Sequence, residues 1–306
     1  MEHILEKGIC FILWLQQASP VLDIPFTALT FLGEEAFFLL ALPFLYWCID
    51  RSVGARITLL FLFSAWINAS AKIIADQPRP FEYDPRIQKL AEAGGGGLPS
   101  GHTQGAVVFW GYLAAAYSRP WLWIVAAVLI VLIPLSRLYL GMHFPTDLLG
   151  GYVIGAGLLI PFLYLEDIIT RWVRKMPMIW QLGMAISFPA LMTVLSPGWD
   201  KNCITAAATM LGMAVGFVLE QRFIGFDTTG TWQCRILRFV VGIIVIMALW
   251  LGLKAAFAGL EPAVLFRFIR YTLVGLWGAL GAPWVFVRLG LADRNVLSAP
   301  LPPASS

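Results

Sequence analysis

The sequence is poor in charged residues, which make up 13% of its 306 positions, whereas 59% are hydrophobic. Such a composition excludes an ordinary soluble domain, in which about 25% of residues are charged. The net charge of +3 is small and the charged residues are dispersed along the chain, so no basic patch that would bind nucleic acid is indicated. The composition predicts an all-α polytopic membrane protein.

Cysteine and histidine are also scarce, with four and three copies. The cysteines at 10, 48, 203 and 234 form no close-spaced pair, which indicates neither a disulfide framework nor a zinc site. The start, MEHILEKG, lacks the basic region of a cleaved signal peptide, so the first membrane segment is expected to be retained.

Long apolar stretches fill most of the chain. Residues 1–22 are too polar for a full span and are expected to form an interfacial helix. Nine further segments approach the ~20 residues that a bilayer-crossing helix needs. They lie at 24–48, 55–75, 103–118, 121–140, 147–166, 178–195, 203–220, 236–258 and 268–290. Residues 292–306 are expected to be a disordered tail.

The distribution of basic residues predicts an orientation, because cytoplasmic loops are enriched in Lys and Arg. If all nine segments cross, most basic residues outside the polar clusters described next fall on one side, which is therefore predicted to be cytoplasmic. The long loop 76–101 and residues 136–147 then face the periplasm or the cell exterior. The expected location is a bacterial inner membrane.

Three polar clusters interrupt the apolar sequence: KIIADQPRP at 72–80, PSGH at 99–102 and SRLYLGMHFPTD at 136–147. Taken singly, they have ordinary interpretations, since Lys72 can snorkel to the interface and Ser100 can cap a helix. Together they contain three cations and two of the three histidines. That combination indicates a site for a tetrahedral oxyanion, with phosphate as the foremost candidate.

Two of the clusters have spacings that suit catalysis. His143 and Asp147 share one face of a helix if that helix begins near His143. A carboxylate that holds one imidazole nitrogen leaves the other lone pair free, which makes histidine a nucleophile or a base. PSGH precedes an apolar run and suits a helix N-terminus, where free backbone N–H groups point at an anion.

In order, the clusters read Lys-x6-Arg-Pro, Pro-Ser-Gly-His and Ser-Arg-x5-His-x3-Asp. This order and spacing resemble the three-part signature of the type 2 phosphatidic acid phosphatase (PAP2) superfamily, in its membrane-bound lipid phosphate phosphatase branch. The resemblance covers roughly residues 20–166 and implies a six-helix catalytic core at 1–166. Residues 167–291 form an extension outside it, with about four additional transmembrane helices.

The resemblance also implies roles for individual residues. His143 would be the nucleophile that forms a phosphohistidine, Asp147 would orient it, and His102 would protonate the leaving oxygen and then activate water. The residues implied to bind the phosphate are Lys72, Arg79, Ser100, Gly101 and Arg137. The implied activity is metal-independent hydrolysis of a lipid phosphate or diphosphate.

Several alternatives stay open. The lipid can be phosphatidate, phosphatidylglycerophosphate, a sphingoid-base phosphate or undecaprenyl diphosphate. A lipid phosphotransferase would use the same intermediate, and a lipid or anion transporter would explain the many helices but not the clusters. Membrane lipids are expected partners. Small residues in the extension suit close helix packing, as a wall for a lipid tail or as a homo-oligomer interface. They are Gly212, Gly216, Gly242, Gly275, Gly278 and Gly281.

Overall fold

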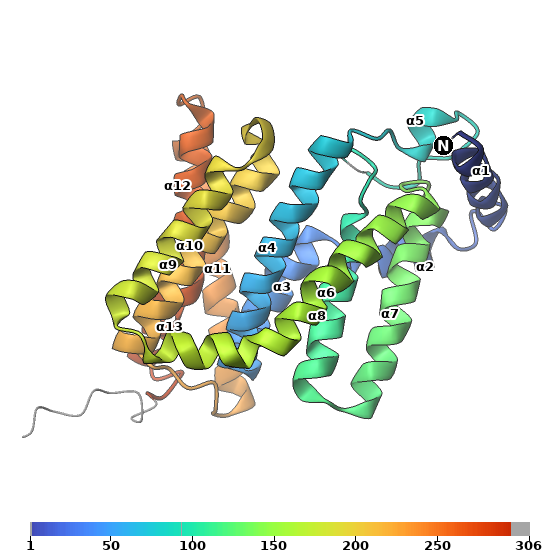
Figure 1. Cartoon of the computed structure of the whole chain (residues 1–306). Coiled ribbons are helices and arrows are strands. Elements are labelled where there is room, and N and C mark those ends of the chain that lie inside the picture. The colour runs from blue at the N-terminus through green and yellow to red at the C-terminus, as the bar shows by residue number, and fades with distance from the viewer. Residues whose placement is uncertain (1, 93, 295–306) are drawn as a thin grey trace, which may run out of the picture. The chain divides into compact units, whose positions relative to one another are not determined.

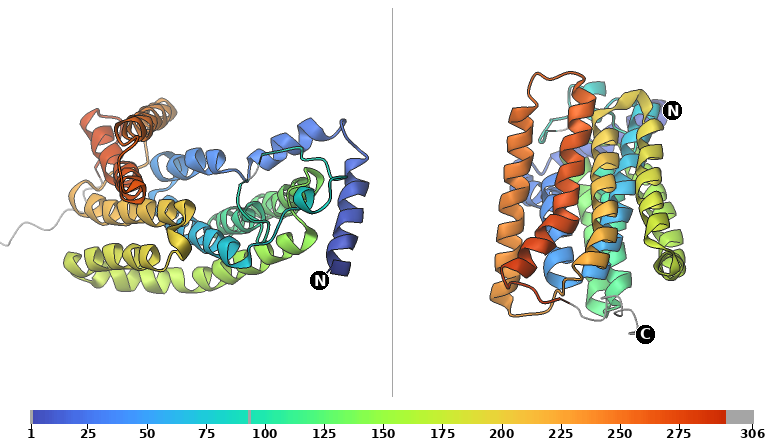
Figure 2. Two further views of the ribbon diagram at one scale, coloured as in Figure 1. Left: turned by 90° about the horizontal axis from the view of Figure 1, so that it is seen from above. Right: turned by 90° about the vertical axis from the view of Figure 1, so that its left-hand side faces the viewer.

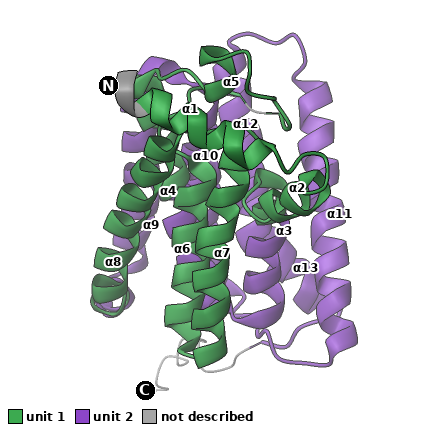
Figure 3. Ribbon diagram, turned by 90° about the vertical axis from the view of Figure 1, so that its right-hand side faces the viewer, with its two compact units in different colours: residues 1–39, 64–170 green, residues 40–63, 171–306 purple. Residues whose placement is uncertain are grey.

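The computed structural model describes residues 2–92 and 94–294, and the chain there is built from helices (Figure 1). It divides into two compact units, Met1–Leu39 with Ser64–Thr170 and Leu40–Phe63 with Arg171–Ser306 (Figure 3). The divisions fall within α3 (Glu35–Phe44), α4 (Arg51–Ala75) and α8 (Pro145–Lys175). Most of the tail predicted at 292–306 lies outside the described residues.

Helix length and hydropathy confirm an all-α polytopic membrane protein. Six described helices are long and apolar enough to cross a bilayer, and a bent pair, Asp23–Phe31 with Glu35–Ile49, makes a seventh if it counts as one span. The expected nine is not reached because α6 (Gly101–Tyr117) and α9 (Met178–Val194) each have only 17 residues. The other predicted segments all coincide with helices that pass the test.

In the first unit, α6 and α7 (Pro120–Tyr139) form an antiparallel hairpin (Figure 1). Ser118 ends α6 in the left-handed conformation, with φ of 49°, and its N–H donates to Ala114 O. Pro120 is the first residue of α7, where a backbone N–H would have no partner within the helix, so proline is well tolerated there. The short turn makes α7 end beside the start of α6, so the second and third clusters come to the same end of the unit.

The N-terminal helix α1 (Glu2–Gln16) packs onto the third cluster and onto the loop 84–92. Ile9 and Ile12 are buried against Ile87 and Phe144. At the end of the helix, the Gln16 side chain donates to the carbonyl oxygens of Tyr139, at 3.0 Å, and Gln88, at 2.8 Å. These contacts fix the loop 84–92 and the end of α7 to one helix.

The start of α6 is held closely by its neighbours. A Cβ on Gly151 of α8 would lie 2.7 Å from Ser100 O, so only glycine permits this approach. On the α4 side, Gln104 Nε2 donates to both the carbonyl and the hydroxyl oxygen of Ser64, each at 2.7 Å. The PSGH segment is therefore fixed by helices on two sides.

The second unit contains α9, α10 (Lys201–Phe223), α11 (Trp232–Ala256) and α12 (Ala263–Leu276), which continues through η3 (Trp277–Gly281) into α13 (Ala282–Arg288). Figure 2 shows α11 and α12 running antiparallel. A Cβ on Gly212 would collide with Thr272 O, and one on Gly275 would lie 2.5 Å from Thr209 O. The predicted close packing is thus confirmed between α10 and α12.

Charged side chains also contribute to the interior of this unit. Glu220 is buried and accepts from Arg51 Nη1 at 3.1 Å and from Phe226 N at 2.9 Å. Arg238, also buried, donates to backbone carbonyls of residues 227–229. These pairings satisfy charges that would otherwise be costly to bury.

Candidate active site

The three polar clusters meet at one end of the first unit, where α4 and α7 end and α6 and α8 begin (Figure 1). Each predicted site residue occupies a helix terminus or an adjoining loop. In the first cluster, Lys72 lies in the last turn of α4 and Arg79 caps α5 (Pro80–Tyr83). In the second, Ser100 caps α6, and Gly101 and His102 begin it. In the third, Arg137 lies in the last turn of α7, His143 precedes α8 and Asp147 lies in the first turn of α8. Lys72 of the first cluster thus shares one site with Arg137 of the third, 65 positions later in the chain.

His143 and Asp147 form a buried pair. His143 Nδ1 lies 3.2 Å from Asp147 Oδ2, which also accepts from Phe144 N at 2.9 Å. The other carboxylate oxygen accepts from Gln77 Nε2 at 3.0 Å. The carboxylate therefore fixes the ring so that Nδ1 is its donor and Nε2 carries the lone pair. Sequence reasoning missed Gln77, whose only signal was its place inside the first cluster.

The electrostatic environment keeps His143 neutral. Burial lowers the pKa of its imidazole well below the usual value of 6.5, and the nearby charges of Lys72, Arg137 and Arg79 lower it further. A neutral imidazole retains the lone pair that a nucleophile needs. Three cations act on this one ring, so an anion drawn to them would be placed next to it.

Lys72 and Arg79 are held by backbone carbonyls of the glycine run 94–97. Lys72 Nζ donates to Gly96 O at 2.6 Å. Arg79 Nε and Nη2 donate to carbonyls of the same run, and Nη1 donates to Met142 O at 2.9 Å. The run thus sets the positions of two cations that sequence reasoning assigned to phosphate binding.

Ser100 and Gly101 connect the second cluster to its neighbours. Ser100 Oγ accepts from Thr103 N at 3.3 Å, and Ser100 N donates to Asp147 O at 2.9 Å. This main-chain bond links the second and third clusters directly. A Cβ on Gly101 would lie 3.0 Å from Asn68 Oδ1, so glycine keeps the first turn of α6 close to α4.

His102 and Arg137 retain unused polar atoms. Arg137 is buried and His102 is half-buried, and neither His102 Nε2 nor Arg137 Nε has a hydrogen-bond partner within the part of the chain that the structure describes. Leaving such a group unpaired costs about 1–3 kcal/mol. A bound oxyanion or its leaving oxygen would satisfy these donors.

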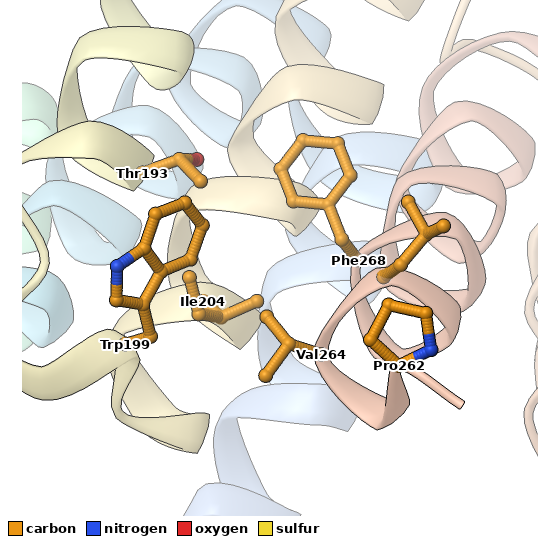
Figure 4. A pocket seen from close by; sticks show the side chains of 7 residues that line it. Thr193, Trp199, Ile204, Pro262, Val264 and Phe268 are labelled. Carbon is orange, nitrogen blue, oxygen red and sulfur yellow. The ribbon is translucent and has the colours of Figure 1, made fainter.

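Within the described residues, neither a metal-binding cluster nor the apolar groove of the second unit contains the predicted site residues. Across residues 2–92 and 94–294, no three His, Cys, Asp or Glu side chains gather in a way that could hold a metal ion. A groove of about 440 Å³ in the second unit is apolar (Figure 4). Its lining residues, Thr193, Trp199, Ile204, Pro262, Val264, Leu265 and Phe268, include none of the predicted catalytic residues.

Comparison with known families matches the part of the chain that contains the three clusters. The PAP2 superfamily model matches residues 54–173, which contain all three clusters, and the model for a PAP2 superfamily phosphatase transmembrane extension matches residues 204–294. The chain belongs to the PAP2 superfamily. This PAP2 protein is a membrane lipid phosphate phosphatase with a C-terminal transmembrane extension.

Individual relatives differ in how much of the PAP2 protein they match. Sphingosine-1-phosphate phosphatase 2 of Mus musculus is 28% identical over 311 residues, 85% of this chain and 86% of that protein. Lipid phosphate phosphatase delta of Arabidopsis thaliana is 26% identical, over 69% of this chain and 55% of that protein. Phosphatidylglycerophosphatase B of Bacillus subtilis is 29% identical, over 51% of this chain and 81% of that protein.

Proposed function

We propose that this PAP2 protein hydrolyses lipid phosphates through a phosphohistidine at His143, without a metal ion. One observation carries the proposal: a buried His143–Asp147 pair, 3.2 Å apart, in which the imidazole lies in the field of three cations. The pair supplies an oriented nucleophile, and the cations supply charge stabilisation that a metal provides in other phosphatases.

The reaction has two steps. His143 Nε2 attacks phosphorus, the bond from phosphorus to the lipid oxygen breaks, and His102 gives that oxygen its proton. Water then attacks the phosphohistidine, His102 takes the proton, and the N–P bond breaks to release phosphate. The buried, unpaired Nε2 of His102 supports its assignment to both proton transfers.

The phosphate-binding roles follow from the donors at the site. Lys72, Arg79 and Arg137 would neutralise the non-bridging oxygens as charge builds up in the transition state. Ser100 and Gly101 lie at the N-terminus of α6, where backbone N–H groups and the helix dipole favour an anion. Ser100 already accepts from Thr103, and its own hydroxyl proton is still available to the substrate.

The placement of the site suits a lipid substrate. Its residues lie at the ends of apolar helices, a depth that matches a phosphate headgroup next to a hydrocarbon tail. We infer that α6 and α9 cross as short spans, which gives a six-helix core followed by four further transmembrane helices. The bias of basic loop residues then directs the site to the periplasm or the exterior of the cell.

Among lipids, a monophosphate of the sphingoid-base class is our first choice. The mouse relative that carries sphingosine-1-phosphate phosphatase in its name aligns over 85% of this chain, including the extension. Phosphatidylglycerophosphate follows, because a relative with a shorter alignment carries phosphatidylglycerophosphatase in its name, and phosphatidate is tested as a second glycerolipid phosphate. Undecaprenyl diphosphate completes the set to be tested.

The decisive experiment measures phosphate release from these four lipids by purified full-length protein in detergent, with EDTA present. Release should survive EDTA and fall at least about a thousandfold in His143→Ala. His3→Ala is the matched control, since it removes the one histidine outside the clusters. Rapid quench with ³²P-labelled substrate should trap an alkali-stable, acid-labile phosphoprotein. Equal turnover by His143→Ala, or loss of release with EDTA, would refute the proposal.

Two other activities predict different outcomes. A phosphotransferase would form the same labelled intermediate but pass the phosphate to an added lipid alcohol, with little free phosphate. A carrier would transport a lipid phosphate across vesicles without any release that depends on His143. Product analysis by thin-layer chromatography separates all three.

A further inference from the structure

The bend between α2 (Asp23–Phe31) and α3 lies against the catalytic residues, although it belongs to none of the three clusters. The two helices meet at 45° across residues 32–34. Thr30, one residue before the end of α2, and Gly33, inside the bend, are both buried. Each contacts a different member of the predicted site.

Thr30 contacts the Arg137 guanidinium. The side chain of Thr30 is only 1% exposed, and its Oγ1 accepts from Arg137 Nη1 at 2.9 Å. Arginine has many accessible rotamers, and fixing one costs up to about 2 kcal/mol of side-chain entropy. A hydrogen bond from a buried neighbour selects one orientation before an anion arrives, so Arg137 Nε is left free for that anion.

Gly33 contacts the His102 ring. A Cβ on Gly33 would lie 2.7 Å from His102 Cδ2 and 2.9 Å from Ile133 Cγ2, closer than real Cβ contacts allow. His102 Cδ2 is the carbon bonded to Nε2, the nitrogen that has no partner in the described chain. Any larger residue at position 33 would therefore displace the ring beside its reactive nitrogen.

We propose that the α2–α3 bend is a fourth part of the active site, in which Thr30 and Gly33 are positioning residues. Thr30 orients Arg137 toward the phosphate, and Gly33 leaves the space that sets the His102 ring. This inference rests on the proposed function, because it assumes that these two groups meet the substrate. A displacement of about 1 Å at a catalytic group can cost about a hundredfold in rate.

Thr30 is tested with an isosteric pair of variants in the full-length protein. Thr30→Val keeps the volume and removes the acceptor, and should lower kcat/KM about tenfold. Thr30→Ser keeps the hydroxyl and should stay within about twofold of wild type. In parallel, inorganic phosphate should protect wild type and Thr30→Ser from thermal denaturation more than it protects Thr30→Val. Equal kinetics and equal protection for all three proteins would overturn this role.

Gly33 is tested against a matched glycine. Gly33→Ala should lower kcat at least about tenfold with KM changed less than about twofold. Gly157→Ala on α8 is the control, because among the described residues nothing beyond the adjoining backbone of its own helix lies within 4 Å of the position its Cβ would take. Full activity in a folded Gly33→Ala protein would overturn this role.

A second background guards against a Gly33 variant that simply fails to fold. His102→Ala combined with Ile133→Ala removes both atoms that the new methyl group would meet, so Gly33→Ala should then have no further effect on the rate of phosphohistidine formation. A further loss in that background would show a general packing defect and refute positioning through His102. Wild-type protein that releases no lipid phosphate would refute the proposed function, whereas normal turnover with unaffected bend variants would refute only this inference.

Discussion

Gln77 should contribute to catalysis entirely through Asp147. The perturbation is Gln77→Ala, which removes the donor 3.0 Å from Asp147 Oδ1 and leaves the bonds from Phe144 N and His143 Nδ1 in place. A hydrogen bond to a charged group contributes about 1.5–3 kcal/mol. Gln77 is only half-buried, so water can replace part of that contribution.

These considerations give about 0.5–1.5 kcal/mol for the loss, or a decrease in kcat of about 2- to 12-fold. The assay is single-turnover formation of the phosphohistidine, which isolates the step that uses the His143–Asp147 pair. Gln77→Glu is a useful companion, because a second carboxylate facing Asp147 should cost more than the loss of the amide.

The reasoning is tested by a double-mutant cycle. In Asp147→Asn, the side-chain oxygen can still accept from Phe144 N and His143, but the group that then faces Gln77 Nε2 is an NH2, which cannot accept its hydrogen bond. Gln77→Ala should therefore change the rate by less than about twofold in that background. The same 2- to 12-fold loss in both backgrounds would refute the idea that Gln77 acts through the carboxylate.

Other predictions concern the cations, α6 and the nucleophile. Arg79→Lys replaces the three donor nitrogens of the guanidinium group by one ammonium nitrogen. The melting temperature and kcat/KM should therefore both fall, kcat/KM about 10- to 100-fold. Unchanged values would contradict the role of the guanidinium group. Gly101→Ala should lower kcat/KM about tenfold, because its Cβ would lie 3.0 Å from Asn68 Oδ1, and Asn68→Ala in the same protein should restore part of the rate. Because the pKa of His143 is lowered, falling pH protonates it only below its usual 6.5. Corrected for substrate ionisation, kcat/KM should therefore hold down to pH 6.5, and a loss centred above that value would disprove the neutral nucleophile.

The sequence predicted local contacts within the candidate site better than contacts between distant segments. His143 and Asp147 are four residues apart and were predicted to share a face if the helix began near His143; the helix begins at Pro145, and the two side chains lie 3.2 Å apart. Ser100 was predicted at a helix N-terminus and caps α6. Such local relations can be read from spacing because they depend on one helix or one turn.

Relations between distant segments were not predictable in this way. Gln77, Thr30 and Gly33 contact the site across helices, and no local pattern indicates which neighbour a side chain will meet. Glu220 pairs with Arg51 across 169 positions for the same reason. The small residues did predict close helix packing, but the choice of α10 and α12 as partners needed the structure. Apolar length did predict the bounds of α6, expected at 103–118 and observed at Gly101–Tyr117.

The carbonyls of the glycine run 94–97 bear on how tightly the product is held. Lys72 and Arg79 already donate to these oxygens, and a bound phosphate must replace those hydrogen bonds. The net free energy of phosphate binding from Lys72 and Arg79 is therefore only the difference between the new bonds and the old ones. The same oxygens can receive the donors again as phosphate leaves. A transition state with greater negative charge gains more from this exchange than the product does. The resulting enzyme would combine fast turnover with weak inhibition by inorganic phosphate.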